Sequence, residues 1–482
     1  MKQTETIAAI ATALSDSGIG IVRISGEEAI EIGNRVYKSK NGCHNLKDYG
    51  SHTIHYGFIV DGEEILDEVM VAIMKAPNSY TKEETIDEVL VMIMRGPHSF
   101  TGEDTVEINC HGGVLIMQKI LEAVLKQGAR LAEPGEFTKR AFLNGRIDLA
   151  RAEAVMDLIH SRNEFALKSS VKQLKGSVSD CIRKMREEIL YEIAFIESAL
   201  DDPEHISTEG YPEKLLPKIQ DLLGRCEKLI NSADNGKVLK EGINTVIVGK
   251  PNAGKSSLLN ILVGEDKAIV TDVAGTTRDV LEESIRLHGI GLNIIDTAGI
   301  RATEDVVEKI GVQRALKYAK DADLILYVVD SSVALDESDE EILDLLKDKK
   351  CIILLNKTDL EPVVTEEMLR EKIGDPRVCM IRTSTKDNTG IEAFENTIKD
   401  MFFGGMLSFN EEVVITSMRH KQALEEARDS LLMVKKSLED EMPEDFYSID
   451  LMSAYASLGL IIGEEVGEDL VNEIFSKFCM GK

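Results

Sequence analysis

The sequence predicts a multidomain protein with an N-terminal α+β domain, an all-helical domain, and an α/β phosphate-loop (Ras-like) domain inserted into the helical one. Three observations predict this class. Residues 1–144 alternate short strands with helices, and helical apolar stripes lie on both sides of the segment 241–402. That segment contains Gly249–Ser257, which fits G-x-x-x-x-G-K-[ST] and directly follows the apolar run Asn244–Val248.

The first 144 residues predict a mixed sheet with a helix near Val114–Lys126. The apolar run Ile7–Leu14 is interpreted as a buried strand rather than a signal segment, because it continues into a loop and a second strand. The other strands are expected at Ile19–Ile24, His52–Ile59, Val89–Met94 and Thr105–Asn109.

A 20-residue repeat interrupts this domain. Leu66–Thr85 is followed at once by Ile86–Thr105, and 11 of the 20 positions are identical. Two units are too few for a solenoid, so the repeat is interpreted as a local duplication. Only the second copy continues into Val106–Gly113, so that copy is expected to occupy the sheet.

Helical patterns flank the central segment. Apolar residues recur every three or four positions from Val178 to Leu200, and again from Leu424 to Leu438 and from Leu451 to Ile461. Pro203 should end the first of these helices. The predicted domain boundaries are 1–144 for the N-terminal domain and 241–402 for the inserted domain. The helical domain is predicted in two parts, 145–240 and 403–482.

Composition limits the function classes. The chain has 85 acidic against 56 basic residues and a net charge of −29, which disfavours non-specific nucleic-acid binding. Its seven cysteines form no C-x-x-C pair, which argues against a zinc site and fits a reducing cytoplasm. No apolar run reaches the length of a transmembrane helix, so no membrane association is expected.

The phosphate loop carries its own chemistry. Its glycines let backbone N–H groups face a phosphate, Lys255 supplies a charge for the β- and γ-phosphates, and the Ser256 hydroxyl suits Mg²⁺. After the next predicted strand, Asp296 can hold the Mg²⁺ shell and Gly299 can meet the γ-phosphate.

Two later segments indicate the base. Asn356-Lys357-Thr358-Asp359 follows the apolar run Cys351–Leu355, and the Asp359 carboxylate can accept two hydrogen bonds from guanine that adenine cannot donate. Ser384-Thr385-Lys386 is expected to form the second wall of the base pocket. These segments in this order predict a GTP-binding domain.

Further stretches resemble one family. The ending Cys479-Met480-Gly481-Lys482 resembles the C-terminal Cys-x-Gly-Lys signature of the MnmE (TrmE) tRNA-modification GTPases. The N-terminal stretches that look like this family's N-terminal domain are Gly20–Gly26, Ser99–Asp104, Pro134–Phe137 and Ala141–Leu149.

The resemblance implies a concrete function. Members of the family are homodimers whose N-terminal domain resembles folate-binding aminomethyltransferase domains and holds a 5-formyltetrahydrofolate or related folate. With an FAD-dependent partner, MnmG, they form a heterotetramer that adds an aminomethyl or carboxymethylaminomethyl group at C5 of the wobble uridine of certain tRNAs. Potassium-dependent association of the G domains activates GTP hydrolysis.

The resemblance also assigns residues around the nucleotide. A glutamine after D-x-x-G often positions the attacking water, but Ile300 stands there, and the resemblance implies that Glu308 takes this role. Potassium ligands are implied at Asn252, Thr271, Val273 and Thr276, with Thr277 for Mg²⁺. The full expected GTP-binding set is Asn252, Ala253, Gly254, Lys255, Ser256, Ser257, Thr271, Asp272, Val273, Ala274, Gly275, Thr276, Thr277, Asp296, Thr297, Ala298, Gly299, Asn356, Lys357, Asp359, Ser384, Thr385 and Lys386.

For the folate, the resemblance points to Arg23, Glu107, Arg146 and Lys482. A carboxylate can accept hydrogen bonds from the donor edge of a pterin, while Arg and Lys can pair with the glutamyl carboxylates. The alternative for any one of these charged residues is a surface ion pair. Cys479 is a candidate catalytic residue by family position, and its alternative is a buried apolar residue.

Two other functions stay open at this point. A ribosome-assembly GTPase would share the nucleotide motifs but would need a basic RNA-binding module. A stand-alone aminomethyltransferase would leave the G domain without a purpose.

Overall fold

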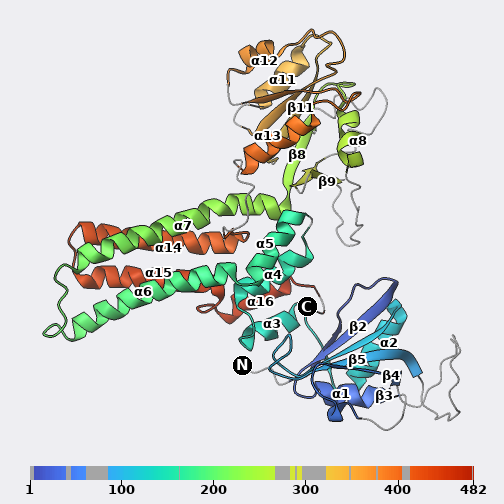
Figure 1. Ribbon diagram of the computed structural model, residues 1–482, viewed down its shortest axis with the longest axis vertical. Helices are drawn as coiled ribbons and strands as arrows, with labels where there is room; N and C mark the ends of the chain where they lie inside the picture. The colour runs from blue at the N-terminus through green and yellow to red at the C-terminus, as the bar shows by residue number, and fades with distance from the viewer. Residues whose placement is uncertain are drawn as a thin grey trace. The chain divides into compact units, whose positions relative to one another are not determined.

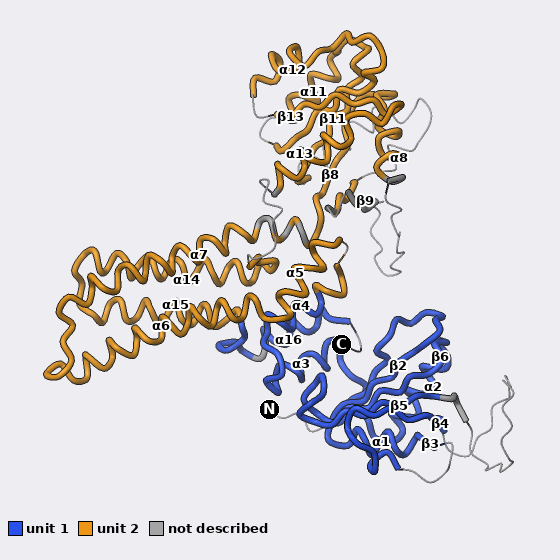
Figure 2. The backbone as a smooth tube through the Cα atoms, in the orientation of Figure 1, with its two compact units in different colours: residues 1–156, 462–482 blue, residues 157–461 orange. Residues whose placement is uncertain are grey.

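The computed structural model describes residues 5–39, 45–60, 85–161, 163–265, 283–287, 290–295, 322–346, 349–375, 378–403, 413–479 and 481. The chain forms two compact units, one of residues 1–156 with 462–482 and one of residues 157–461 (Figure 2). The predicted multidomain class, with an N-terminal α+β part, helices and an α/β part, is confirmed. The predicted domain boundaries themselves stay predictions.

A seven-stranded sheet organises the first unit, in the order β3-β4-β5-β6-β2-β1-β7. Neighbouring strands are antiparallel except for the parallel pair β1 and β7. The strands are β1 (Ile7–Ile10), β2 (Ser17–Ser25), β3 (Tyr37–Ser39), β4 (Thr53–Val60), β5 (Thr85–Met94), β6 (Thr105–Gly112) and β7 (Arg130–Leu131). A short 3₁₀ helix, η1 (Leu46–Asp48), lies between β3 and β4.

The predicted strands are confirmed here, but the N-terminal run Ile7–Leu14 is a buried strand only over Ile7–Ile10, and Leu14 is exposed. Strand β5 comes from the second copy of the repeat and pairs with both β4 and β6, as expected. Most of the first copy, residues 66–84, lies outside the described residues.

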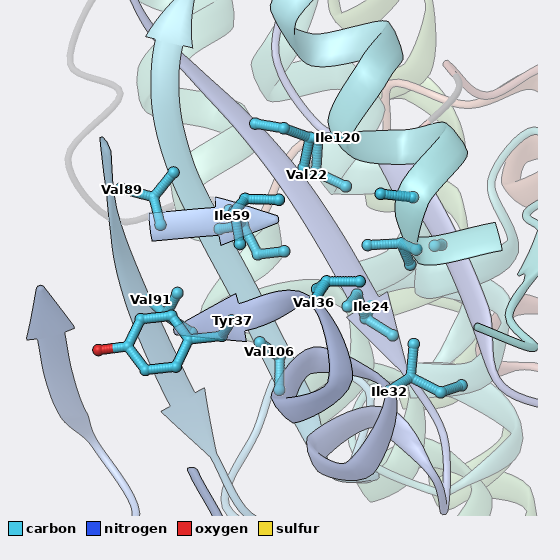
Figure 3. Packing of buried hydrophobic residues seen from close by; sticks show 14 of the residues in the cluster. Val22, Ile24, Ile32, Val36, Tyr37, Ile59, Val89, Val91, Val106 and Ile120 are labelled. Atoms are coloured by element: carbon cyan, nitrogen blue, oxygen red, sulfur yellow. The ribbon is translucent and has the colours of Figure 1, made fainter. Parts of the chain in front are cut away.

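Two helices, α1 (Ala29–Val36) and α2 (Val114–Lys126), cover one face of this sheet. Their apolar stripes supply Ile32 and Ile120 to a core that includes Val22 and Ile24 of β2 (Figure 3). Because alternate residues of a strand point to opposite faces, Arg23 lies on the face away from this core.

The C-terminal segment of the chain packs within the first unit. Phe475 of α16 (Glu468–Ser476) and Leu149 of α4 (Leu149–Ile159) share a buried apolar cluster with Phe478. Helix α3 (Glu136–Leu143) begins at Gly135, whose backbone N–H donates to the Cys479 carbonyl at 3.3 Å. The tail is therefore held close to α3.

The helices of the second unit that flank the inserted domain lie on both sides of it in the sequence. They are α5 (Glu164–Leu174), α6 (Ser177–Asp201), α7 (Tyr211–Glu241), α14 (Met418–Glu439) and α15 (Glu444–Ile462). Helix α7 enters the inserted domain, and α14, which follows it, packs alongside α7 (Figure 1). The apolar stripes on α14 and α15 are buried, as expected. Within the described parts of the chain, no helix combines the length and apolarity needed to cross a membrane.

The inserted domain contains a six-stranded sheet in the order β13-β12-β11-β8-β10-β9, parallel except for β9 against β10. Its strands are β8 (Ile243–Val248), β9 (Glu283–Leu287), β10 (Ile290–Ile294), β11 (Leu324–Asp330), β12 (Cys351–Asn356) and β13 (Cys379–Arg382). The central strands are almost continuously buried, which is typical of a parallel sheet covered on both faces.

Helices cover both faces of this sheet. One core joins Leu258 of α8 (Lys255–Glu265) and Phe394 of α13 (Ile391–Phe403) to the sheet. The other joins Ile342 of α11 (Glu337–Leu345) and Leu369 of α12 (Glu366–Ile373) to its opposite face. The carboxyl ends of β8, β11 and β12 therefore meet at one edge, where ligands of open α/β sheets bind.

Candidate nucleotide-binding site

The loop between β8 and α8 has the backbone conformation that its glycines permit (Figure 1). Gly249 has φ +149° and Gly254 has φ +103°. A Cβ atom on Gly249 would lie 2.3 Å from the Val328 carbonyl oxygen, and one on Gly254 would lie 2.0 Å from Nδ2 of Asn356. Asn252 has φ +60°, a conformation that Asn tolerates better than most residues.

Lys255 begins α8 and reaches back over the loop. Its Nζ donates to the carbonyl oxygens of Gly249 at 2.7 Å and Lys250 at 2.6 Å. Ser256 and Ser257, which follow it in the first turn, are exposed. A helix N-terminus with a bound ammonium beside it favours anions, so this end of α8 suits a phosphate.

Asn356 connects three predicted segments. Its side chain is buried at the end of β12, and its Nδ2 donates to the Ala253 carbonyl at 2.8 Å. Its Oδ1 accepts from the Thr385 backbone N–H at 3.2 Å. One asparagine thus fixes the phosphate loop to the segment predicted as a wall of the base pocket.

The Asp359 carboxylate is held by that same wall. Ser384 Oγ donates to Asp359 Oδ1 at 3.1 Å, and Lys386 Nζ lies 3.9 Å from Oδ2. The Asp359 side chain is 18% exposed, so it is oriented without being fully enclosed. This arrangement suits the acceptance of hydrogen bonds from a guanine base.

Asp330, at the end of β11, is a site residue that sequence reasoning missed. Its Oδ2 lies 2.5 Å from the Nζ of Lys357, a residue that has φ +61°. Burial raises the pKa of Asp330, but the Lys357 ammonium and the Ser332 hydroxyl more than offset it, so the net pKa is lowered. The only sequence signal was an acidic residue at a strand end.

The proposed folate residues lie in the first unit. Arg23 pairs with Glu107 across β2 and β6, with Nη2 2.7 Å from Glu107 Oε1. Arg23 Nη1 also donates to the Gly481 carbonyl at 3.2 Å, and its guanidinium lies over the rings of Phe100 and Phe137. The alternative considered for these charges was a surface ion pair; Arg23 and Glu107 do form an ion pair, but both side chains are mostly buried. Their role in folate binding stays a prediction.

Arg146 is exposed and lines a cavity in the first unit. A cavity of about 620 Å³ contains Arg146 together with Phe100, whose ring also contacts Arg23. The other lining residues are His52, Met94, Pro97, His98 and Ser99.

Cys479 is exposed, so the alternative that it is a buried apolar residue is wrong. Among the buried thiols, desolvation raises the pKa of Cys226 to about 12 and that of Cys351 to about 11. Accessibility keeps a chemical role open for Cys479.

Several predicted site residues lie outside the described residues. They are Thr271, Asp272, Val273, Ala274, Gly275, Thr276, Thr277, Asp296, Thr297, Ala298, Gly299, Glu308 and Lys482. In the part of the chain that the structure describes, no group of three or more His, Cys, Asp or Glu side chains could hold a metal ion.

A parallel sheet with helices on both faces, a phosphate loop after β8 and an Asn-Lys-x-Asp segment after β12 together define a P-loop G domain. The class is therefore a multidomain protein with a G domain inserted between helices.

Comparison with known proteins narrows this class. The chain matches the family models described as MnmE helical domain, over residues 149–479, and as GTP-binding protein TrmE N-terminus, over residues 6–87 and 82–146. It is 56% identical over 480 residues to the tRNA modification GTPase MnmE of Lachnoclostridium phytofermentans, covering 100% of both chains. The chain therefore belongs to the MnmE family of tRNA modification GTPases.

Other relatives agree. The chain is 46% identical to the proteins of the same name from Alkaliphilus oremlandii, with 99% of both chains covered, and from Acetivibrio thermocellus, with 100% covered. About 33% of the chain also aligns with 97% of the G domain of the T. maritima FeoB iron transporter, at 27% identity and a TM-score of 0.25, which is too low to support any argument about the fold.

Proposed function

We propose that this protein hydrolyses GTP and uses that reaction in tRNA modification. The observation that carries the proposal is the Asp359 carboxylate, which Ser384 orients at the sheet edge where Asn356 holds the phosphate loop. Full-length identity to MnmE relatives supports the link to tRNA.

The particular chemistry proposed is addition of an aminomethyl or carboxymethylaminomethyl group at C5 of the wobble uridine. The chain would act in the cytoplasm as a homodimer with an MnmG-like, FAD-dependent partner in a heterotetramer, and the added carbon would come from 5-formyltetrahydrofolate. Family membership supports this assignment.

For hydrolysis we propose a division of roles around the phosphate loop. Lys255 neutralises charge on the β- and γ-phosphates, and the exposed Ser256 hydroxyl beside it fits a Mg²⁺ ligand, completed by Thr277. Asn252, exposed and in the left-handed conformation, fits an oxygen donor for K⁺, with Thr271, Val273 and Thr276. Asp296 supports the Mg²⁺ shell, and Glu308 orients the attacking water.

For the folate we propose that Glu107 and Arg23 bind the ligand, and that Arg146 and Lys482 form ion pairs with its glutamyl carboxylates. The Arg23 guanidinium donates to the Gly481 carbonyl, which supports a contribution of the C-terminal tail to this set. A bound folate would supply the one-carbon unit. Cys479, exposed on the same tail, is the proposed catalytic thiol.

The test is nucleoside analysis of tRNA from cells that lack this chain, with genes for the wild type or for Lys255→Ala restored. We expect loss of the modified wobble uridine in the deletion, recovery with wild type and no recovery with Lys255→Ala. Unchanged modification in the deletion would refute the proposal and favour a ribosome-assembly GTPase.

The metal assignments have their own test. Replacing K⁺ by Na⁺ at equal ionic strength should slow hydrolysis strongly, whereas equal rates would remove the proposed K⁺ role. Glu308→Ala should abolish turnover and leave GTP affinity unchanged, and normal turnover would contradict the role of Glu308.

A further inference from the structure

Lys250 belongs to the phosphate loop, but its side chain is directed to the start of α11. Its Nζ lies 2.7 Å from Asp339 Oδ2 and 3.1 Å from Asp336 Oδ2, and it donates to the Ala334 carbonyl at 3.2 Å. Burial lowers the pKa of Lys250, but the two carboxylates more than offset this, so its pKa is raised and it stays charged.

Asp339 is the buried centre of these contacts. Its side chain is 1% exposed, and its Oδ1 accepts from the Tyr327 hydroxyl at 2.7 Å. Its Oδ2 accepts from Lys250 and also from the backbone N–H of Asp336 at 2.9 Å. Both carboxylate oxygens are thus engaged, and the set Lys250, Asp336, Asp339 and Tyr327 is called here the Lys250 network.

The Lys250 network is joined to the phosphate-binding lysine through the backbone. The Lys250 carbonyl accepts from Lys255 Nζ at 2.6 Å, while the Lys250 side chain is anchored on α11. Residue 250 is therefore held at its backbone by Lys255, the lysine proposed to meet the phosphates, and at its side chain by α11. Such double anchoring limits the conformations open to a loop before it binds.

We propose that Lys250, Asp339 and Tyr327 are positioning residues that hold the phosphate loop in its binding conformation and so slow the release of bound nucleotide. The proposal rests on the proposed binding of GTP and adds to it a residue set that touches no phosphate. Loss of the contacts leaves the loop to be ordered by the nucleotide itself, which weakens binding.

Asp339→Asn separates this role from simple electrostatics. Removing a negative charge near bound phosphates should, by charge alone, slow the release of nucleotide. Positioning predicts the opposite sign, because a neutral amide removes the ion pair with Lys250 whichever way its NH₂ group faces.

The experiment measures the dissociation rate of a fluorescent GTP analogue from the full-length protein. We expect about tenfold faster release from Asp339→Asn and a smaller acceleration from Tyr327→Phe, which keeps the Asp339 charge and its hydrogen bond from the Asp336 N–H. The double variant Lys250→Met/Asp339→Asn should release nucleotide no faster than Lys250→Met alone, because both variants lack the same contact, the one between Lys250 and Asp339.

Lys372→Met is the matched control. It removes another lysine that pairs with α11, since Lys372 Nζ lies 2.6 Å from Glu340 Oε1, but that pair is exposed and lies outside the Lys250 network. Its release rate should equal that of the wild type.

The outcomes separate the two proposals. A wild-type protein that does not bind GTP refutes the proposed function. A wild type that binds, with Asp339→Asn releasing nucleotide at the wild-type rate or more slowly, overturns the positioning role alone. A lowered melting temperature of Asp339→Asn and Tyr327→Phe with unchanged release rates would also overturn it, because it would show a purely structural network.

Discussion

Two candidate sites hold their charged groups in opposite ways, one at the phosphate loop and base pocket of the G domain and one at Arg23 in the N-terminal unit. In the G domain, Lys255 is bonded to backbone carbonyls, and Asp359 is oriented by the neutral Ser384 hydroxyl. In the N-terminal unit, Arg23 is bonded to Glu107, and the buried Arg140 is bonded to Glu136. The first arrangement leaves net charge for a ligand, whereas the second neutralises charge within the protein.

This difference determines which contacts a ligand must replace at each of the two sites. A nucleotide can meet Lys255 and Asp359 without breaking a close ion pair, because the partners of Lys255 are backbone carbonyls and the nearest partner of Asp359 is the Ser384 hydroxyl. A ligand at Arg23 and Glu107 must compete with an ion pair that is 15% and 14% exposed. The N-terminal site should therefore depend on both members of the pair together.

The largest effect is expected for Asn356→Ala, which tests whether neutral contacts organise the G-domain site. The change leaves the Ala253 carbonyl and the Thr385 N–H without their partner, at a cost of about 2 kcal/mol in unfolding free energy. GTP affinity should fall between about tenfold and a hundredfold. Calorimetric titration measures the affinity.

Asn396→Ala is the control for this prediction, because Asn396 is exposed on α13 of the same domain. It should keep the affinity of the wild type. Equal affinities for Asn356→Ala and Asn396→Ala would show that the three segments hold their places without the asparagine.

A smaller effect is expected for Arg23→Met, which leaves Glu107 without its partner. Because the pair is only mostly buried, the expected loss is about 1 to 2 kcal/mol of unfolding free energy. The double variant Arg23→Met/Glu107→Gln should recover part of that loss, since no charge is then left alone. Denaturant titration of the single and double variants measures these losses. Strictly additive losses would show that Arg23 and Glu107 are not coupled, which would contradict the contrast drawn between the two sites.

The smallest effect is a pH dependence at Glu136. Burial raises the pKa of Glu136, but hydrogen bonds from Arg130, the Glu133 N–H and Arg140 more than offset it, so its pKa is lowered from 4.5. A lowered folded-state pKa contributes stability above the unfolded pKa, and that stability is lost as the pH falls through the folded pKa.

The stability difference between wild type and Glu136→Gln should therefore shrink by about 1 kcal/mol as the pH falls from roughly 5 through the folded-state pKa. Melting temperatures across this range give the measurement. Glu164→Gln is the control, since Glu164 pairs with Lys168 on the surface and should show little difference at any pH. A difference that grows towards low pH would give the wrong sign.

The sequence predicted the G-domain elements because their chemistry is local. The strand, the glycine turn and the lysine of the phosphate loop are contiguous, so their order alone predicts an anion site. Sequence reasoning also put Asn356 and Asp359 in the expected GTP-binding set at a strand end, where parallel strands meet at one edge. It did not predict the hydrogen bond from Asn356 to the phosphate loop.

Long-range partners could not be predicted in the same way. Lys250 and Asp339 are far apart in the chain, and nothing in G-x-x-x-x-G-K-[ST] shows where its second residue points. The Arg23–Glu107 pair depends on the register of β2 against β6. The exposure of Cys479 depends on how the tail packs on α3. The sequence does not show this packing, so it left a buried Cys479 as an alternative that the structure contradicts.

The most direct test of the central claim, that this G domain reads guanine through Asp359, is nucleotide specificity in Asp359→Asn. Competition binding with GTP and xanthosine triphosphate should show a preference for GTP in the wild type and a preference for xanthosine triphosphate in the variant, because an amide complements the extra carbonyl of xanthine. Unchanged preference for GTP in Asp359→Asn would contradict the account.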